Sequence, residues 1–333
     1  EDNISDYFSG ILLLNEKEYS ESYKFLKKLN GLEESHINYS SKYLYSLVNS
    51  GKITEAVNYA KKLEKKNLDN YESNLIIGIY YLRNKQFELA QKYFQRLKDS
   101  NTRFLLNNYI SKSLSNWSSL GNLNLSDAQN KINSLDSRFE NLKKIQNTFL
   151  HCYYKSPKTN SLFNELTSNT TIDFSRYNYF YASYLTSIDE IKKAKQITSS
   201  SLELFPRNLL LNQYKFELNS ENNLKSFSCQ NQSHVAAEIL YIAANALSSQ
   251  TLYTFSNFYL NLAKYLNTNF YSFNILLAEN FYKIENFNQA KKIYSDLGKQ
   301  GNAFSWYAAK QVSKILVKEN KYKDALKLLK NNY

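Results

Sequence analysis

The sequence predicts an all-α protein built from stacked pairs of helices, and three observations lead to this prediction. Seven Gly and two Pro in 333 residues fall far below the usual ~7% and ~5%, so the turn residues that sheets and tight hairpins need are scarce. Apolar residues recur at spacings of three, four and seven, as they do on one face of a helix. The third observation is an internal repeat with a period of 34 residues.

The repeat is marked by a small residue at every 34th or 35th position in two stretches of the chain. These markers are Ser22, Ala56 and Ala90, and later Ser256, Ala290 and Ala325. Each marker stands at position 20 of its unit, with a second small residue at position 8 in several units and large residues at positions 11, 17, 24 and 27. In unit 71–104 these residues are Gly78 and Ala90, then Tyr81, Phe87, Phe94 and Leu97.

This pattern has a physical reason. Small side chains at positions 8 and 20 let two antiparallel helices approach within the usual contact distance of about 8 to 10 Å. The large residues fill the volume around that contact. One such pair has too little surface to bury, so it becomes stable only against neighbouring pairs. We therefore expect a row of helix pairs.

The period and the pattern of small residues at 8 and 20 with aromatic residues at 11 and 24 resemble the tetratricopeptide repeat family. The resemblance covers about nine-tenths of the chain and implies a right-handed α-α superhelix. On this basis we expect three segments: residues 3–208 with about six repeats, an irregular seam at 209–236, and residues 237–333 with about three repeats.

Motifs for catalysis are missing from the sequence. It has three histidines and no HExxH, GxSxG, Walker A or GxGxxG pattern, so neither an enzyme nor a metal or cofactor site is expected. His36 and His234 are expected at the surface. Cys152 and Cys229 lie far apart without a CxxC pattern, and the sequence favours two unpaired thiols.

The net charge of +12 raises the alternative of an anionic partner, such as RNA or an envelope glycolipid. The lysines, however, are scattered singly or in pairs at positions expected on the wet sides of helices, so nucleic acid is disfavoured. No run of 18 apolar residues is present, so we expect no transmembrane segment, and peripheral membrane association stays open.

In tetratricopeptide superhelices the first helix of each pair lines a concave groove with its positions 2, 5, 9 and 12. The resemblance therefore implies a groove that is apolar and aromatic towards the N-terminus. A protein or peptide partner would contact Tyr7, Ile11, Tyr45, Leu75, Ile79, Trp117, His151, Tyr154 and Tyr179. The alternative is that tight curvature packs these side chains against one another or against a terminal segment. No unit carries the Lys and Asn pair of the carboxylate-clamp repeats, which argues against that mode of binding.

The order of units is also similar to that of a group of exported bacterial tetratricopeptide proteins of unassigned role. This similarity implies a periplasmic or otherwise exported protein, with a cytoplasmic location as the alternative. A first residue Glu1 in place of Met is what removal of a signal peptide would leave, and a trimmed N-terminus would look the same.

Overall fold

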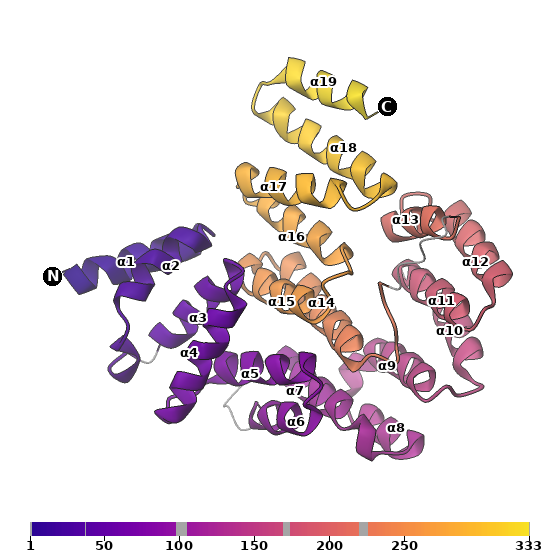
Figure 1. The fold of residues 1–333 in the computed structure, drawn as a ribbon, viewed down its shortest axis with the longest axis horizontal. Helices are drawn as coiled ribbons and strands as arrows, with labels where there is room; N and C mark the ends of the chain where they lie inside the picture. Colours follow the sequence, from indigo (N-terminus) through magenta and orange to yellow (C-terminus); the bar gives the residue numbers. More distant parts are fainter. Residues whose placement is uncertain (1, 37, 98–104, 169–173, 220–225, 333) are drawn as a thin grey trace. The chain divides into compact units, whose positions relative to one another are not determined.

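A computed structural model describes residues 2–36, 38–97, 105–168, 174–219 and 226–332 (Figure 1). These residues form helices and connecting turns and contain no strand. The α-helices are α1 Asp2–Asn15, α2 Tyr19–Lys28, α3 Tyr39–Asn49, α4 Ile53–Lys65, α5 Tyr71–Arg83, α6 Phe87–Arg96, α7 Leu105–Ser118, α8 Leu125–Asn133, α9 Glu140–Tyr153, α10 Thr159–Thr167, α11 Ser175–Ser187, α12 Ile191–Leu204, α13 Leu209–Glu217, α14 Gln232–Ser249, α15 Tyr253–Leu266, α16 Ser272–Lys283, α17 Phe287–Gly298, α18 Asn302–Lys318 and α19 Tyr322–Asn331. Short 3-10 turns are η1 Leu32–Glu34, η2 Leu120–Asn122 and η3 Ser137–Phe139.

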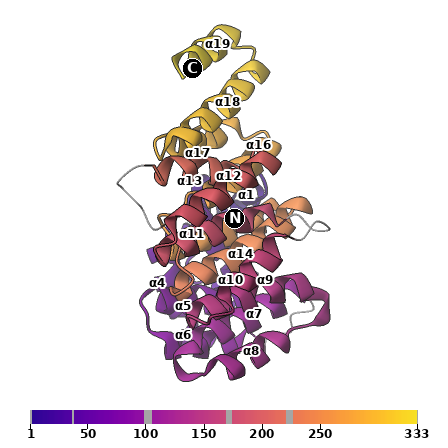
Figure 2. The same cartoon turned by 90° about the vertical axis from the view of Figure 1, so that its right-hand side faces the viewer.

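Consecutive helices pack in pairs, which confirms the all-α fold of stacked helix pairs. Extensive contacts join α1 with α2, α5 with α6, α11 with α12, α16 with α17 and α18 with α19. The last pair, α18 and α19, is visible in the turned view (Figure 2). The predicted unit 71–104 contains the pair α5 and α6, whereas the predicted boundary between residues 236 and 237 falls inside α14.

The small residues at positions 8 and 20 lie at the contact within each pair. A Cβ added to Gly78, at position 8, would come within 2.5 Å of the ring of Phe94, so only glycine leaves room there. Where position 8 or 20 is serine, its hydroxyl donates to a carbonyl of the paired helix. These bonds are Ser22 to Gly10 at 2.8 Å, Ser256 to Ala244 at 2.8 Å and Ser313 to Ala325 at 3.3 Å. Serine at these positions is therefore small enough for the close contact and also joins the two helices of the pair by a hydrogen bond.

The turn inside each pair explains how the chain manages with few glycines. Position 15 adopts the left-handed conformation in seven units, at Lys17, Gly51, Lys85, Asp189, Thr251, Glu285 and Asn320. The N–H of the following residue donates to the carbonyl five residues back at 2.8 to 3.0 Å, as in a Schellman motif. Only one of these seven residues is glycine. The other six adopt a left-handed conformation that costs non-glycine residues conformational energy, and the hydrogen bond stabilises the turn against that cost.

The chain forms two compact units that do not follow the predicted segments. The first, which we call unit 1, contains residues 1–136 and 236–266, and the second, unit 2, contains residues 137–235 and 267–333. In unit 1, α15 packs against α3 and α5, far away in the sequence (Figure 1). In unit 2, α13 packs against both α12 and α18. α13 lies in the predicted seam, of which residues 220–225 lie outside the described residues.

The expectation of two unpaired thiols is wrong. Cys152 at the end of α9 and Cys229 in the segment before α14 form a disulfide within unit 2, with Cα atoms 5.9 Å apart. The two residues are separated by 77 positions, so spacing gave no sign of the pairing. Both cysteine side chains are buried. The bond links the end of α9 to a segment that is otherwise irregular.

Candidate functional site

In unit 1 the predicted groove residues face α15. The side chains of Tyr45, Leu75 and Ile79 are buried. The ring of Tyr45 meets the rings of Phe255 and Phe258 edge-on, with centroids 5.3 and 4.9 Å apart. Helix α15 therefore covers these side chains of α3 and α5, and it is an internal helix and not the terminal segment that the self-packing alternative named.

Polar contacts fix α15 in this place. The hydroxyls of Tyr71 and Tyr259 lie 3.2 Å apart, and Asn49 donates to the carbonyl of Thr254 at 3.2 Å. Burial raises the pKa of the Tyr259 hydroxyl far above its usual range, so the hydroxyl stays neutral. Because α15 buries apolar residues on several sides, it is part of the core and not a loosely held strap.

The remaining predicted residues of unit 1 differ in exposure. Trp117 on α7 is completely buried. Tyr7 and Ile11 on α1 are half-buried, and the ring of Tyr7 lies 4.7 Å from that of His36. Of the predicted groove residues in this unit, Tyr7 and Ile11 are therefore the two that a partner could reach without a rearrangement.

In unit 2 the predicted residues Tyr179 and His151 are buried, and Tyr154 is half-buried. Tyr179 shares a hydrogen bond with Ser226, and its ring packs against that of Phe270 at 5.6 Å. Nδ1 of His151 lies 2.9 Å from the Ser156 hydroxyl, and burial lowers the pKa of the imidazole. These contacts hold Tyr179 and His151 inside the fold.

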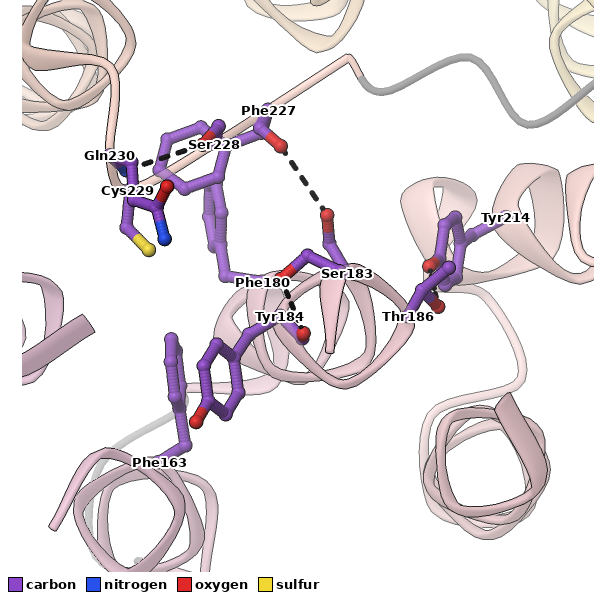
Figure 3. A pocket seen from close by; sticks show the side chains of 11 residues that line it. Phe163, Phe180, Ser183, Tyr184, Thr186, Tyr214, Phe227, Ser228, Cys229 and Gln230 are labelled. Atoms are coloured by element: carbon purple, nitrogen blue, oxygen red, sulfur yellow. Dashed lines mark hydrogen bonds between the residues drawn. The ribbon is translucent and has the colours of Figure 1, made fainter. Parts of the chain in front are cut away.

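Beside these residues lies a cavity of about 150 Å³ (Figure 3). Its walls come from α11, from Phe163 of α10, from Tyr214 of α13 and from residues 227–230 before α14. Ser183 and Thr186 of α11 stand at the inward positions 9 and 12 of the predicted unit 175–208, and both are part of this wall. We call this space the α11 cavity.

Aromatic rings form the apolar walls of the α11 cavity. The rings of Phe163 and Tyr184 stack with centroids 5.5 Å apart, and Phe180 meets Phe227 edge-on at 4.5 Å. Phe163, Phe180 and Phe227 are almost fully buried, whereas Tyr184 is half-buried. A wall of packed rings keeps its shape when the space is empty.

Hydroxyl groups give the α11 cavity its polar side. Thr186 and Tyr214 share a hydrogen bond of 2.6 Å, and the hydroxyl of Ser183 donates to the carbonyl of Phe227 at 3.5 Å. Gln230 is exposed at the rim. Burial raises the pKa of Tyr214 to about 12, so this hydroxyl remains a neutral donor and acceptor.

The disulfide holds one wall of the α11 cavity in place. Cys229 is itself a wall residue and is bonded to Cys152 of α9. The backbone N–H of Ser228 donates to Nδ1 of His234 at 3.1 Å, and burial lowers the pKa of His234 to about 4. The expectation of a surface position for His234 is therefore wrong, since its ring is half-buried against this segment.

A second cavity of about 110 Å³ in unit 2 is lined by Tyr179, Glu217, Phe270 and neighbouring residues. Gln213 donates to the carboxylate of Glu217 at 3.1 Å. Burial raises the pKa of Glu217, and the bond from Gln213 opposes this shift. Tyr179 thus lies on the wall of a cavity, although its hydroxyl is bonded within the fold.

Sequence reasoning missed several wall residues of the α11 cavity, namely Tyr214, Phe227, Ser228 and Gln230. They belong to the predicted irregular seam at 209–236, for which the sequence predicts one helix-like segment followed by a polar loop or a degenerate second helix. The one signal was Cys229 in the middle of that polar run. Within the described residues, no group of three His, Cys, Asp or Glu side chains is placed to hold a metal ion. No helix in the same residues is long and apolar enough to cross a membrane.

No protein-family model and no curated protein match the sequence. Solved structures with some likeness include the complex of Naa15/Naa10 bound to HypK-THB, with 13% identity, 99% of this chain and 68% of that chain covered, and a TM-score of 0.24. The TPR domain of P58(IPK) has 12% identity, coverages of 100% and 92%, and a TM-score of 0.28. Yeast Tom70 has 12% identity, coverages of 99% and 91%, and a TM-score of 0.26. With TM-scores this low, the fold assignment rests on the helix pairs themselves.

Proposed function

We propose that this chain is a non-catalytic helical-repeat scaffold that binds a protein partner, which inserts one large side chain into the α11 cavity. The observation that supports this proposal is the place of Ser183 and Thr186. Both stand at positions expected to face a partner, and both line a cavity, whereas most of the other predicted groove residues are buried. Tyr7, Ile11 and Tyr154 remain proposed contacts at the edges of the inner face.

The size and chemistry of the α11 cavity suit a side chain better than a cofactor. Sites for drug-sized ligands usually occupy about 300 to 1,000 Å³, and this cavity is about 150 Å³. Packed rings would take an apolar or aromatic group, while the hydroxyls of Ser183 and Thr186 would bond to polar atoms next to it. Gln230 at the rim would contact the partner's backbone.

The disulfide supports an oxidising compartment for this scaffold. Disulfides persist in secreted and periplasmic proteins and are rare in the reducing cytosol. The bond between Cys152 and Cys229 therefore favours the exported location over the cytoplasmic alternative. Labelling of free thiols in protein taken directly from its native cells tests this point, because two reactive thiols there would contradict it.

The binding proposal is tested with a displayed library of random peptides selected on the immobilised protein. We expect the enriched peptides to share one aromatic or large aliphatic residue. Ser183→Trp should fill the cavity and weaken binding of those peptides on the order of tenfold or more. Ser199→Trp, at an exposed position of α12, is the matched control and should leave binding unchanged. Circular dichroism melts show whether each variant is folded. Equal binding by Ser183→Trp and the native protein would refute the proposal, as would a library without enriched peptides.

The charge of the last helix pair favours a second candidate, the binding of an anionic polymer. Residues 302–333 contain seven Lys and two acidic residues. An anionic polymer would release counterions there, so retention on heparin should fall steeply as salt rises. We expect substitution of Lys310, Lys314 and Lys318 by Gln to shift elution to lower salt. Elution of the native protein at low salt would remove this candidate.

A further inference from the structure

A half-buried carboxylate lies on the wall of the second cavity of unit 2, which has a volume of about 110 Å³. We call this space the α13 cavity, because Leu210, Gln213 and Glu217 of α13 form part of its wall. Among the described residues of the wall, Glu217 is the one acidic side chain, and none is Lys, Arg or His. The α13 cavity is therefore an acidic site in a chain whose net charge is +12.

Gln213 fixes the position of this carboxylate where α13 packs against α18. The side-chain amide of Gln213 donates to Oε1 of Glu217 at 3.1 Å, and the backbone N–H of Ala303 donates to the amide oxygen of Gln213 at 3.2 Å. A Cβ on Gly301 would overlap the amide of Gln213, so the glycine allows this close approach. A carboxylate accepts several hydrogen bonds at once, so a further donor can join the bond from Gln213.

Aromatic rings form much of the rest of the wall. Phe270 and Phe304 are almost fully buried, and Tyr271 meets Phe304 edge-on with ring centroids 6.4 Å apart. The face of an aromatic ring attracts cations. Phe270 already has such a contact, because the guanidinium of Arg176 lies 5.3 Å from the centroid of its ring. Rings next to a carboxylate therefore favour a positively charged ligand.

The α13 cavity is accessible and small. Asn269 and Gln300 on its wall are exposed, which gives a ligand access from solvent. A cavity of about 150 Å³ can hold benzene, so a volume of about 110 Å³ suits the end of one alkyl chain. A metal ion would need several ligands, and within the described residues no group of three His, Cys, Asp or Glu side chains is placed to hold one.

We propose that the α13 cavity binds a primary ammonium group on an alkyl chain, either the end of a lysine side chain or a free alkylamine. The ammonium donates to the carboxylate of Glu217, and the rings of Phe270, Tyr271 and Phe304 contact the methylene groups next to it. Burial raises the pKa of Glu217, because the charged carboxylate loses solvation, and a bound cation compensates for that loss.

This inference goes beyond the proposed function and does not rest on it. Among the described residues, the α11 cavity and the α13 cavity share no wall residue. Binding at the α13 cavity can therefore fail while the α11 cavity binds its peptides, and the reverse.

The test compares two probes on the full chain, n-butylammonium and its neutral counterpart 1-butanol, with dissociation constants measured by ligand-observed NMR. We expect n-butylammonium to bind at least about tenfold more tightly, because it alone offers a charge to Glu217. Glu217→Gln keeps the shape of the side chain and removes its charge. It should weaken binding of n-butylammonium on the order of tenfold or more and leave binding of 1-butanol unchanged. Glu165→Gln, at an exposed carboxylate of α10, is the matched control and should bind both probes like the native protein.

A third probe, Nα-acetyl-lysine methylamide, separates the two sources of the ammonium group. If it binds and Glu217→Gln weakens that binding, the cavity receives a lysine side chain of a partner. If n-butylammonium binds and this probe does not, the ligand is a free amine. Equal affinity of the native protein for n-butylammonium and 1-butanol would overturn the proposal without any variant, as would the absence of measurable binding. So would unchanged binding of n-butylammonium by a Glu217→Gln variant that a thermal melt shows to be folded.

Discussion

Removal of the disulfide between Cys152 and Cys229 should destabilise unit 2 substantially. The bond closes a loop of 77 residues, and the chain-entropy relation gives about 4.5 kcal/mol for a loop of this length at 25 °C. Measured losses for native disulfides commonly lie between about 2 and 5 kcal/mol. The double variant Cys152→Ala and Cys229→Ala should therefore lose a free energy of unfolding in that range. The wall of the α11 cavity formed by residues 227–230 should also lose its fixed position.

Urea unfolding, followed by far-UV circular dichroism, measures this loss. The native protein with a reductant should behave like the double variant, and the double variant should not respond to the reductant. A thiol assay on the unfolded native protein should find no free thiol before reduction. A loss below about 0.5 kcal/mol, or two free thiols in the unreduced protein, would show that the bond does not restrain the chain as the loop length implies.

Three further predictions concern the repeat and the pH dependence of stability. Gly78→Ala should lower the free energy of unfolding by about 1 to 3 kcal/mol, because the added Cβ would press on the buried ring of Phe94. The control Gly121→Ala places its Cβ in open space and should change the free energy of unfolding little. Equal urea midpoints for the two variants would contradict this prediction. Thr251→Gly should stabilise the protein by about 1 kcal/mol, since Thr251 has a φ of 61° that a β-branched residue rarely adopts, and a thermal melt at or below the native one would refute it. Burial lowers the pKa of His234 to about 4 from an ordinary value of 6.5, so the unfolded chain takes up a proton first as pH falls. The stabilisation from the neutral imidazole is complete above pH 6.5, amounts to about 3 kcal/mol, and should be lost as pH falls from 6.5 to about 4. NMR titration of the imidazole measures the pKa of His234. A value near 6.5 would show that the ring is not buried.

The helix pairs could be predicted from the sequence because their determinants are local. Positions 8 and 20 lie within one unit of 34 residues, and the contact between them needs only a small side chain on each helix. Gly78 and Ala90 show this, as does the hydrogen bond from Ser22 to Gly10. The left-handed residue at position 15 is local too. It was not predicted, because Lys85 and Glu285 do not resemble the Gly or Asn usual at such turns.

The disulfide and the place of α15 depend on contacts between distant residues. The sequence of one unit does not distinguish Tyr45, which packs against Phe255, from an inward residue that is accessible to a binding partner. The pairing of Cys152 with Cys229 likewise depends on how the chain returns after α13. A periodic pattern specifies which face of a helix is apolar, and it does not specify what covers that face.

The character of the inward positions helps to separate covered from accessible parts of the inner face. Where these positions are apolar, as at Leu75 and Ile79, leaving them in water would cost roughly 25 cal/mol per Å², and the chain covers them with its own helix. Where they are polar, as at Ser183 and Thr186, there is little to gain by covering them, and a cavity remains. An apolar inner face in such an array thus favours closure by the chain itself. Polar inward positions bordered by aromatic rings are the better guide to a partner's binding site.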